Sequence, residues 1–225
     1  MHCNKRVCKE LHFKTMENRV DKEKKFWNAK AKKYDDVVNK FFPEIYEFVL
    51  ANLNHDTSKS EHLLEIATGT GIIATKLSDH VSHITAIDIA PEMLKVAKDK
   101  CAKKQINNID FRVGDACNLE FEDKTFDTIV ASNVLHLLFT PSLALEEMKR
   151  VLKDEGKIIV PTFCHGANLR SHILSRILGL FGQSTRSRWS KKSFKEFIEH
   201  NGFKIIKDSY IDAKIPLLYL VAIKK

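Results

Sequence analysis

The sequence is most constrained by short apolar runs that alternate with amphipathic helical segments from Glu61 onward. Five runs have the length and composition of buried strands. They are His62–Ile66, His83–Ile87, Ile109–Val113, Phe126–Ala131 and Lys157–Thr162. Helices are predicted between them over Gly71–Leu77, Pro91–Lys104 and Pro141–Leu152. Strands that alternate with helices of this length are typical of a parallel sheet with helices on both faces.

The C-terminal part of the chain adds a helix and two further strands. The helix is predicted from Ser190 to Gly202, and the strands over Phe203–Asp212 and Ile215–Ile223. Because the link between these strands is too short for a crossover helix, they should pair antiparallel. We therefore predict an α/β, Rossmann-like fold. Its seven-stranded sheet should be mostly parallel, with helices on both faces and an antiparallel C-terminal strand.

The 225 residues fit one large domain. Residues 1–20 are predicted to be a disordered basic tail, and residues 21–225 to form a single domain. Within it we expect an N-terminal helical cap over residues 21–54 and a basic amphipathic insertion over residues 165–189. The chain contains no run long and apolar enough to span a membrane. Its five cysteines at irregular spacing suit a reduced, cytoplasmic protein.

The net charge of +8 comes from one part of the chain. Residues 156–195 contain eight Lys and Arg residues and no acid, which equals the whole excess. A local patch of this kind concerns a partner or substrate and not the fold. Two interpretations stay open for the insertion: a lid helix packed over a substrate pocket, or a surface for anionic membranes and lipid-like substrates.

The central motif is LLEIATGTG at residues 63–71, where a strand leads into a glycine turn that opens a helix. Glycine is needed where backbone approaches a ligand closely or takes angles that a side chain forbids. Residues 69–74 also satisfy the spacing G-x-G-x-x-G/A of dinucleotide sites, although that match alone is weak. The alternative is a glycine turn that serves packing only.

Three acids stand close to this turn or to the next strand ends. Asp88 ends the second strand, where a carboxylate can bind both ribose hydroxyls of an adenosine ligand; alternatively it caps the helix that Pro91 opens. Asp115 follows the third strand, where it could accept from an adenine amino group or belong to an ordinary turn. Glu65 precedes the turn and would favour a cationic group over a pyrophosphate.

These motifs together resemble those of class I S-adenosylmethionine-dependent methyltransferases. The run LEIATGTG is similar to motif I of that family, and Ile87-Asp88, Gly114–Ala116 and Phe126–Val130 are similar to its following motifs. Residues Glu147–Lys157 resemble the segment before strand five. The pairs Phe26-Trp27 and Tyr34-Asp35 resemble an N-terminal signature of the branch that contains quinone-biosynthesis methyltransferases, so the resemblance runs from about Phe26 to the C-terminus.

Two positions depart from the family pattern. Ala67 stands where motif I usually has its first glycine, and Asp154-Glu155 replaces a Pro-Gly pair. Alanine is compatible with this turn if the backbone keeps a negative φ there, and we expect that conformation.

The resemblance implies S-adenosyl-L-methionine as the cofactor and a binding site at the carboxyl ends of the strands. Gly69, Gly71 and Glu65 should lie along its methionine part, and Asp88 should bind the ribose. The implied cofactor-binding residues are Tyr34, Glu65, Ala67, Thr68, Gly69, Gly71, Asp88, Ile89, Met93, Gly114, Asp115, Ala116, Ser132, Asn133 and His136.

The remaining members of this set have implied roles as well. Asp115 and the backbone of Ala116 should read the adenine edge, between the side chains of Ile89 and Met93. Tyr34 should close the site from the N-terminal helices.

Ser132, Asn133 and His136 should border the methyl donor. Methyl transfer from a sulfonium requires mainly alignment of nucleophile and methyl group, so we assign no catalytic residue. A base is needed only where the acceptor loses a proton. His136 and His165 are candidates because both lie near expected strand ends, although a lone histidine more often has a structural or surface role.

The predicted function is methyl transfer to a small-molecule or lipid-like acceptor by direct in-line displacement, with contact to an anionic membrane as a further hypothesis. The alternatives are an RNA methyltransferase and a non-enzymatic S-adenosylmethionine-binding protein. A nucleic-acid substrate is disfavoured because the segment after strand four lacks the Asn/Asp-Pro-Pro-aromatic motif of base methyltransferases, and the chain has no Pro-Cys pair.

Two other patterns are weaker. Tyr210 and Lys214 have the Y-x-x-x-K spacing of short-chain dehydrogenases, but that pair needs a helix and here falls in a strand-rich tail. A zinc site is only weakly indicated by His2, Cys3, Cys8 and His12, and we predict no metal site.

Overall fold

The computed structural model describes residues 20–58, 60–164, 186–213 and 215–225. The predicted tail, except Val20, and the predicted insertion, except residues 186–189, lie outside these residues. The same is true of His165, of Lys214 and of the four N-terminal zinc candidates.

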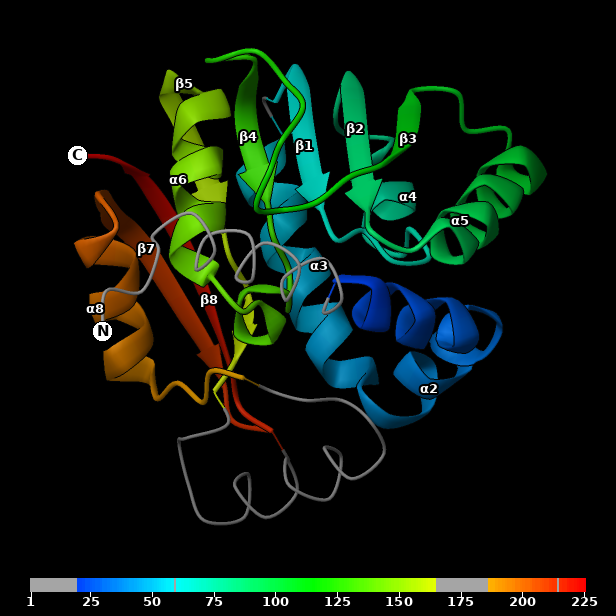
Figure 1. Ribbon diagram of the computed structural model, residues 1–225, viewed down its shortest axis with the longest axis horizontal. Helices are drawn as coiled ribbons and strands as arrows, with labels where there is room; N and C mark the ends of the chain where they lie inside the picture. The colour runs from blue at the N-terminus through cyan, green and yellow to red at the C-terminus, as the bar shows by residue number, and fades with distance from the viewer. Residues whose placement is uncertain (1–19, 59, 165–185, 214) are drawn as a thin grey trace, which may run out of the picture.

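The strands form one sheet that confirms the predicted fold (Figure 1). They are β1 His62–Ile66, β2 His83–Asp88, β3 Ile109–Val113, β4 Phe126–Val130, β5 Leu152–Ile159, β6 Thr162–Phe163, β7 Phe203–Ile211 and β8 Leu217–Lys224. The order is β3-β2-β1-β4-β5-β8-β6, with β7 on β8. The first five are parallel neighbours, whereas β8 is antiparallel to β5, β6 and β7.

The sheet has eight strands where seven were expected, because the predicted fifth strand is divided. β5 and β6 both pair with β8, on either side of Val160 and Pro161. Pro161 has no N–H to donate, so the ladder is interrupted at that residue.

The helices lie close to their predicted positions, with one clear difference. They are residues 20–30, η1 Ala31–Lys33, α2 Tyr34–Phe41, α3 Pro43–Thr57, α4 Ala74–Leu77, α5 Pro91–Lys104, η2 Leu135–Leu137, α6 Pro141–Val151 and α8 Lys191–His200. Pro43, Pro91 and Pro141 open their helices, as expected for a residue that has no N–H. The helix predicted from Gly71 begins only at Ala74, because the preceding residues form turns.

Two apolar layers cover the two faces of the sheet, as predicted. Leu64 and Ile66 of β1 pack in one core cluster with residues of α6 and α8. Leu63 points to the other face, where α3, α4 and α5 supply the packing residues. This alternation is the period of two of a strand buried on both sides. Figure 1 shows α6 in front of the sheet and α3 behind it.

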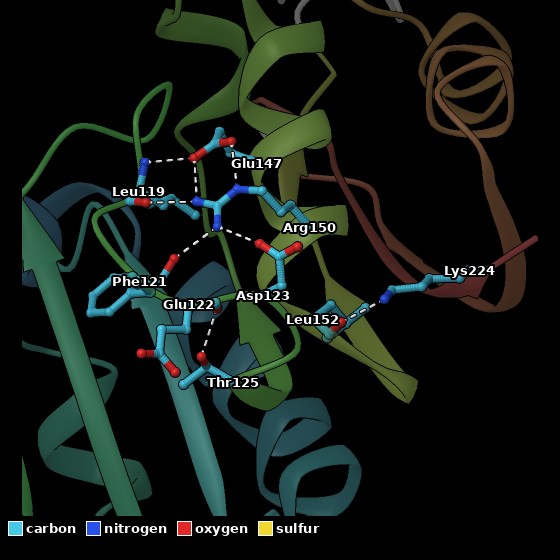
Figure 2. Close-up of polar contacts among 9 residues, drawn as sticks. All are labelled: Leu119, Phe121, Glu122, Asp123, Thr125, Glu147, Arg150, Leu152 and Lys224. Atoms are coloured by element: carbon cyan, nitrogen blue, oxygen red, sulfur yellow. Dashed lines mark hydrogen bonds and ion pairs between the residues drawn. The ribbon is translucent and has the colours of Figure 1, made fainter.

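Arg150 of α6 fastens the connection between β3 and β4 (Figure 2). Its guanidinium group donates to the carbonyl oxygens of Leu119 and Phe121 at 2.7 and 2.8 Å. It also pairs with the carboxylates of Glu147 and Asp123 at 2.8 and 2.9 Å, and Arg150 lowers the pKa of Glu147. One side chain therefore holds a long loop against α6, which fixes the chain between the end of β3 and the start of β4.

Candidate functional site

A large cavity lies at the carboxyl edge of the parallel strands, where ligands bind in open α/β sheets. Its volume is about 570 Å³, within the usual range for pockets that hold small molecules. In Figure 1 α2 lies at the edge toward which the arrowheads of β1 and β2 point. All predicted site residues except Glu65, Thr68 and Gly71 line this cavity.

The backbone of the turn after β1 departs from our expectation at Ala67. Its φ is +55°, so the expectation of a negative φ is wrong. The left-handed conformation costs an L-residue about 1–2 kcal/mol relative to glycine. The conformation is held because the next N–H, of Thr68, donates to the carbonyl oxygen of Ile87 in β2 at 2.9 Å. Glycine, which the family usually has at this position, takes a positive φ without strain, whereas Ala67 takes it at that cost.

The two glycines of the turn have different roles. Gly69 has φ +56° and lines the cavity, and a Cβ there would point at the Tyr34 ring, 3.9 Å from Cε1. Gly71 has φ +72° and does not line the cavity, and a Cβ there would lie 2.9 Å from Cβ of Ala97. Gly69 therefore leaves room for a ligand, whereas Gly71 allows the turn to pack against α5.

Glu65 lies beneath the turn and not on the cavity wall. Only 2% of its surface is exposed, and its Oε2 accepts a hydrogen bond of 2.6 Å from the Thr68 hydroxyl. Burial raises the pKa of Glu65 to about 8, although hydrogen bonds from Thr68 and the Ala74 N–H lower it in part. With that pKa, the carboxyl is largely protonated at neutral pH. The hydrogen bond from the Thr68 hydroxyl connects it to the turn.

Asp88 holds the turn to the end of β2. Its Oδ2 accepts from the Gly69 N–H and its Oδ1 from the Ala90 N–H, both at 2.8 Å. Burial raises the pKa of Asp88, against these backbone hydrogen bonds. Each oxygen retains lone pairs for further donors such as ribose hydroxyls. The alternative that Asp88 caps the helix opened by Pro91 is wrong. Ala90 is the N-cap residue of that helix, and no side chain caps it.

The turn after β3 brings the residues predicted for the adenine together. Asp115 Oδ1 accepts from the Cys117 N–H at 2.9 Å, which closes a local turn. Gly114 packs tightly, since a Cβ there would lie 3.3 Å from Ile87. Ile89, Met93, Asp115 and Ala116 all line the same end of the site as part of one cavity.

The segment after β4 forms another part of the cavity wall. Asn133 has φ +54°, donates its N–H to the Pro161 carbonyl oxygen at 2.8 Å and accepts from the Phe163 N–H at 3.2 Å. His136 is 5% exposed, with its ring 6.2 Å from that of Phe163 in an edge-to-face arrangement. The wall is thus tied to β6 by backbone and ring contacts.

Polar contacts hold the N-terminal helices against the glycine turn. Asp35 accepts from the Thr70 hydroxyl at 2.5 Å and forms an ion pair with Lys100 of α5. The hydroxyl groups of Tyr34 and Tyr46 lie 3.4 Å apart, and burial raises the pKa of both. Residues predicted only from a family signature thus close the cavity over the turn.

Most of the remaining wall is apolar and was missed from the sequence. The side chains that were not predicted include Trp27, Val37, Val38, Phe41, Phe42, Tyr46, Leu138, Phe139, Phe163 and Ile215. The apolar stripes of residues 26–49 did indicate amphipathic helices. Periodicity does not say which part of an apolar stripe meets the core and which part meets a cavity.

The dehydrogenase and metal alternatives find no support in the described part of the chain. Tyr210 lies in strand β7 and not on a helix. Within residues 20–58, 60–164, 186–213 and 215–225, no group of three or more His, Cys, Asp or Glu side chains could hold a metal ion. Of the helices in these ranges, none has the length and apolar character to cross a bilayer.

The fold and the cavity define a class of protein: a Rossmann-like domain with a cavity of ligand size at the carboxyl ends of β1, β2 and β3. A methyltransferase domain model matches residues 64–160. The chain is therefore similar to the class I S-adenosylmethionine-dependent methyltransferases, and in particular to their quinone-biosynthesis branch. The cofactor of that family is S-adenosyl-L-methionine, as predicted, and the match supports the prediction of an enzyme.

Known proteins give the extent of this similarity. Demethylmenaquinone methyltransferase of Paenarthrobacter aurescens is 31% identical over 172 residues, covering 73% of this chain and 66% of that protein. The ubiquinone/menaquinone biosynthesis C-methyltransferase of Zymomonas mobilis is 36% identical over 108 residues, covering 46% of this chain and 43% of that protein. The chain thus spans less than two thirds of the length of these relatives.

A solved structure extends the similarity in fold. The S-adenosylmethionine-dependent methyltransferase of Aquifex aeolicus superposes with a TM-score of 0.65 at 21% identity, over 87% of this chain and 98% of that one.

Proposed function

We propose that the protein transfers a methyl group from S-adenosylmethionine to a small apolar acceptor of the quinone or lipid-like kind, by direct in-line displacement. One observation carries the proposal: the residues expected to hold the cofactor share a cavity with a second, apolar wall. A cavity with two chemically different halves suits two ligands that must meet.

The cofactor half fits a sulfonium nucleoside. Gly69 presents bare backbone, Asp88 offers carboxylate lone pairs to a ribose, and Asp115 stands where an adenine amino group would donate. When bound, S-adenosylmethionine supplies a methyl group activated by the positive sulfur, which is left as a neutral thioether.

The acceptor half is lined by carbon-rich side chains, among them Val38, Phe42, Leu138, Phe163 and Ile215. Among the described residues that line the cavity there is no Lys or Arg, so an anionic substrate such as RNA gains no charge partner there. The names of the relatives point the same way, since demethylmenaquinone carries an aromatic ring system. An aromatic carbon or a lipid-like group is therefore the preferred acceptor.

The chain's own contribution to the reaction is placement and exclusion of water. In C-methylation the acceptor carbon donates an electron pair to the methyl group and then loses a proton to a base. His136 is the candidate for that base, because its side chain borders the cavity next to Phe163. Methylation of an amine or a thiol also releases one proton, so a base or water must accept that proton there as well.

Three free thiols, Cys101, Cys117 and Cys164, support the proposed cytoplasmic location. Reduced cysteines are usual in that compartment.

The test is a labelled-methyl assay with demethylmenaquinol, phosphatidylethanolamine and total RNA as separate acceptors, with products identified by mass. We expect methylation of the quinol. Calorimetry should show binding of S-adenosylmethionine, weakened at least about tenfold by Asp88→Ala, which removes charge-assisted contacts. Asp110→Ala is the matched control, an acid of β3 that pairs with Arg112 outside the cavity.

The outcomes separate the alternatives. Cofactor binding without transfer to any acceptor would favour the non-enzymatic binding protein, and transfer to RNA would favour a nucleic-acid enzyme. Absence of cofactor binding by the wild-type protein would overturn the proposal altogether.

A further inference from the structure

Two large apolar side chains stand exposed on one face of α2, at the cavity. Val37 is 46% exposed and Phe41 is 56% exposed, and both also line the cavity. They are four residues apart in one helix and therefore lie on the same face. The other large apolar residues that are exposed in the described ranges, such as Ile206 of β7, do not line the cavity.

Both side chains belong to α2, which contains Asp35, Asp36 and Lys40, and the helical segment before α2 is rich in lysine. Residues 20–42 contain seven Lys and four acids. Two of the acids are already engaged, Glu23 with Arg186 and Asp35 with Lys100. Lys40 lies next to the apolar pair, with its Nζ 5.4 Å from the centre of the Phe41 ring. Lys40 therefore places a positive charge beside Phe41, within an N-terminal segment in which Lys outnumbers the acids.

A second basic segment meets the N-terminal helices at the cavity. Residues 186–195 contain five Lys and Arg residues and no acid. Arg186 joins the two parts, because it pairs with Glu23 at 2.7 Å and its guanidinium lies 3.2 Å from the centre of the Phe139 ring. Glu23 and Phe139 both line the cavity, and Arg188 next to this junction is exposed.

We propose that α2 and residues 186–188 form a docking surface for an anionic lipid bilayer. Val37 and Phe41 enter the region below the headgroups, while Lys40 and Arg188 bind the headgroups themselves. Apolar side chains ringed by cations are the combination that holds a protein at such an interface. Nucleic acid would be served by the charges alone and would leave the two apolar side chains in water.

The inference adds to the proposed function the place from which an apolar acceptor is taken. Since Val37 and Phe41 are at once exposed and part of the cavity wall, an acceptor could pass from the bilayer into the cavity without crossing water. Docking is tested without any methyl transfer, so its failure and that of the proposed function are distinguishable.

The test is co-sedimentation of the full chain with vesicles of phosphatidylcholine alone and of phosphatidylcholine with an equal part of phosphatidylglycerol. We expect binding to the mixed vesicles, weaker binding to the neutral ones, and loss of the difference in high salt. Val37→Ser with Phe41→Ser should weaken partitioning at least about tenfold. The matched control is Ile206→Ser, which changes a side chain that is 53% exposed on β7.

A second pair of variants tests the charges. Lys40→Gln with Arg188→Gln should weaken binding to the mixed vesicles about tenfold and leave binding to neutral vesicles unchanged. Neither residue lines the cavity, so methylation of a water-soluble acceptor should keep its rate. Thermal unfolding and binding of S-adenosylhomocysteine verify that each variant is folded.

Three results would overturn the inference. The wild-type protein could fail to sediment with either kind of vesicle. The Ile206→Ser variant could lose as much binding as the double serine variant. Finally, total RNA could displace the wild-type protein from vesicles, while the variant with Val37→Ser and Phe41→Ser binds both the RNA and the vesicles as well as the wild type does.

Discussion

Glu65 offers the sharpest test of the site's electrostatics, through the substitution Glu65→Gln. The side chain is 2% exposed and its carboxyl has a pKa of about 8, against an ordinary value of 4.5. Glutamine has nearly the same shape. Its amide can accept from the Ala74 N–H and donate to the Thr68 hydroxyl, so the change removes chiefly the ionisable group.

The expected effect follows from the difference in proton binding between the two states. Below about pH 4.5 the carboxyl is protonated in both the folded and the unfolded chain, and it adds no pH dependence. Between about pH 4.5 and 8 the unfolded chain loses this proton while the folded chain keeps it, so stability falls as pH rises. The loss is about 1.4 kcal/mol per pH unit, which over the full shift sets an upper limit of about 5 kcal/mol.

The assay is urea unfolding of wild type and Glu65→Gln, without cofactor, at several pH values across this window. We expect the stability of the glutamine variant relative to wild type to increase by about 2–3 kcal/mol between pH 5.5 and pH 7.5. Other titrating groups are common to both proteins and largely cancel in this difference. A constant difference across the window would refute the argument, since it would show that Glu65 ionises in the folded protein as it does in water.

Three further substitutions test the backbone of the turn and the loop that Arg150 holds, each by its unfolding free energy. Ala67→Gly should stabilise by about 0.5–1 kcal/mol, because relief of the left-handed strain exceeds the added entropy of the unfolded chain; a destabilised variant would contradict this. Gly71→Ala should destabilise by about 2–4 kcal/mol, since a methyl group there meets Ala97 at 2.9 Å and φ is +72°; a loss below 1 kcal/mol would mean that the turn relaxes. Arg150→Lys should cost about 1–3 kcal/mol, as a lysine cannot reach both loop carbonyl oxygens and two carboxylates, and an unchanged value would show that the loop is held otherwise.

The strand plan was readable from the sequence because each strand is a short apolar run with its own boundaries. The first four parallel strands and the antiparallel C-terminal pair lie close to where periodicity and turn residues indicated, whereas β5 begins at Leu152, five residues before its predicted start at Lys157. The break at Pro161 and the late start of α4 were not predicted, although proline and two glycines mark both places in the sequence. Whether such a residue ends an element or is absorbed within it depends on the hydrogen bonds of neighbouring strands.

The φ of Ala67 shows a stricter limit. A sequence gives residue types, and alanine alone favours negative φ. Here the conformation is set from outside the residue, by the backbone hydrogen bond from Thr68 to Ile87 and by the Asp88 carboxylate that holds the Gly69 N–H. Local preference therefore loses to two contacts with β2, a neighbour in the sheet but some twenty residues away in the chain.

The two halves of the cavity differ in predictability for the same reason. Residues predicted for the cofactor, such as Asp88 and Asp115, lie at the end of a strand or soon after one, so strand order alone brings them to one edge. The apolar half is assembled from α2, from the segment after β4 and from residues such as Ile215, which are distant in sequence and share no motif. Whether these residues come together depends on the position of the N-terminal helices. The hydrogen bond that Thr70 donates to Asp35 and the ion pair of Arg186 with Glu23 fix that position. A family signature can thus indicate the cofactor, whereas the apolar side of the cavity becomes visible only in three dimensions.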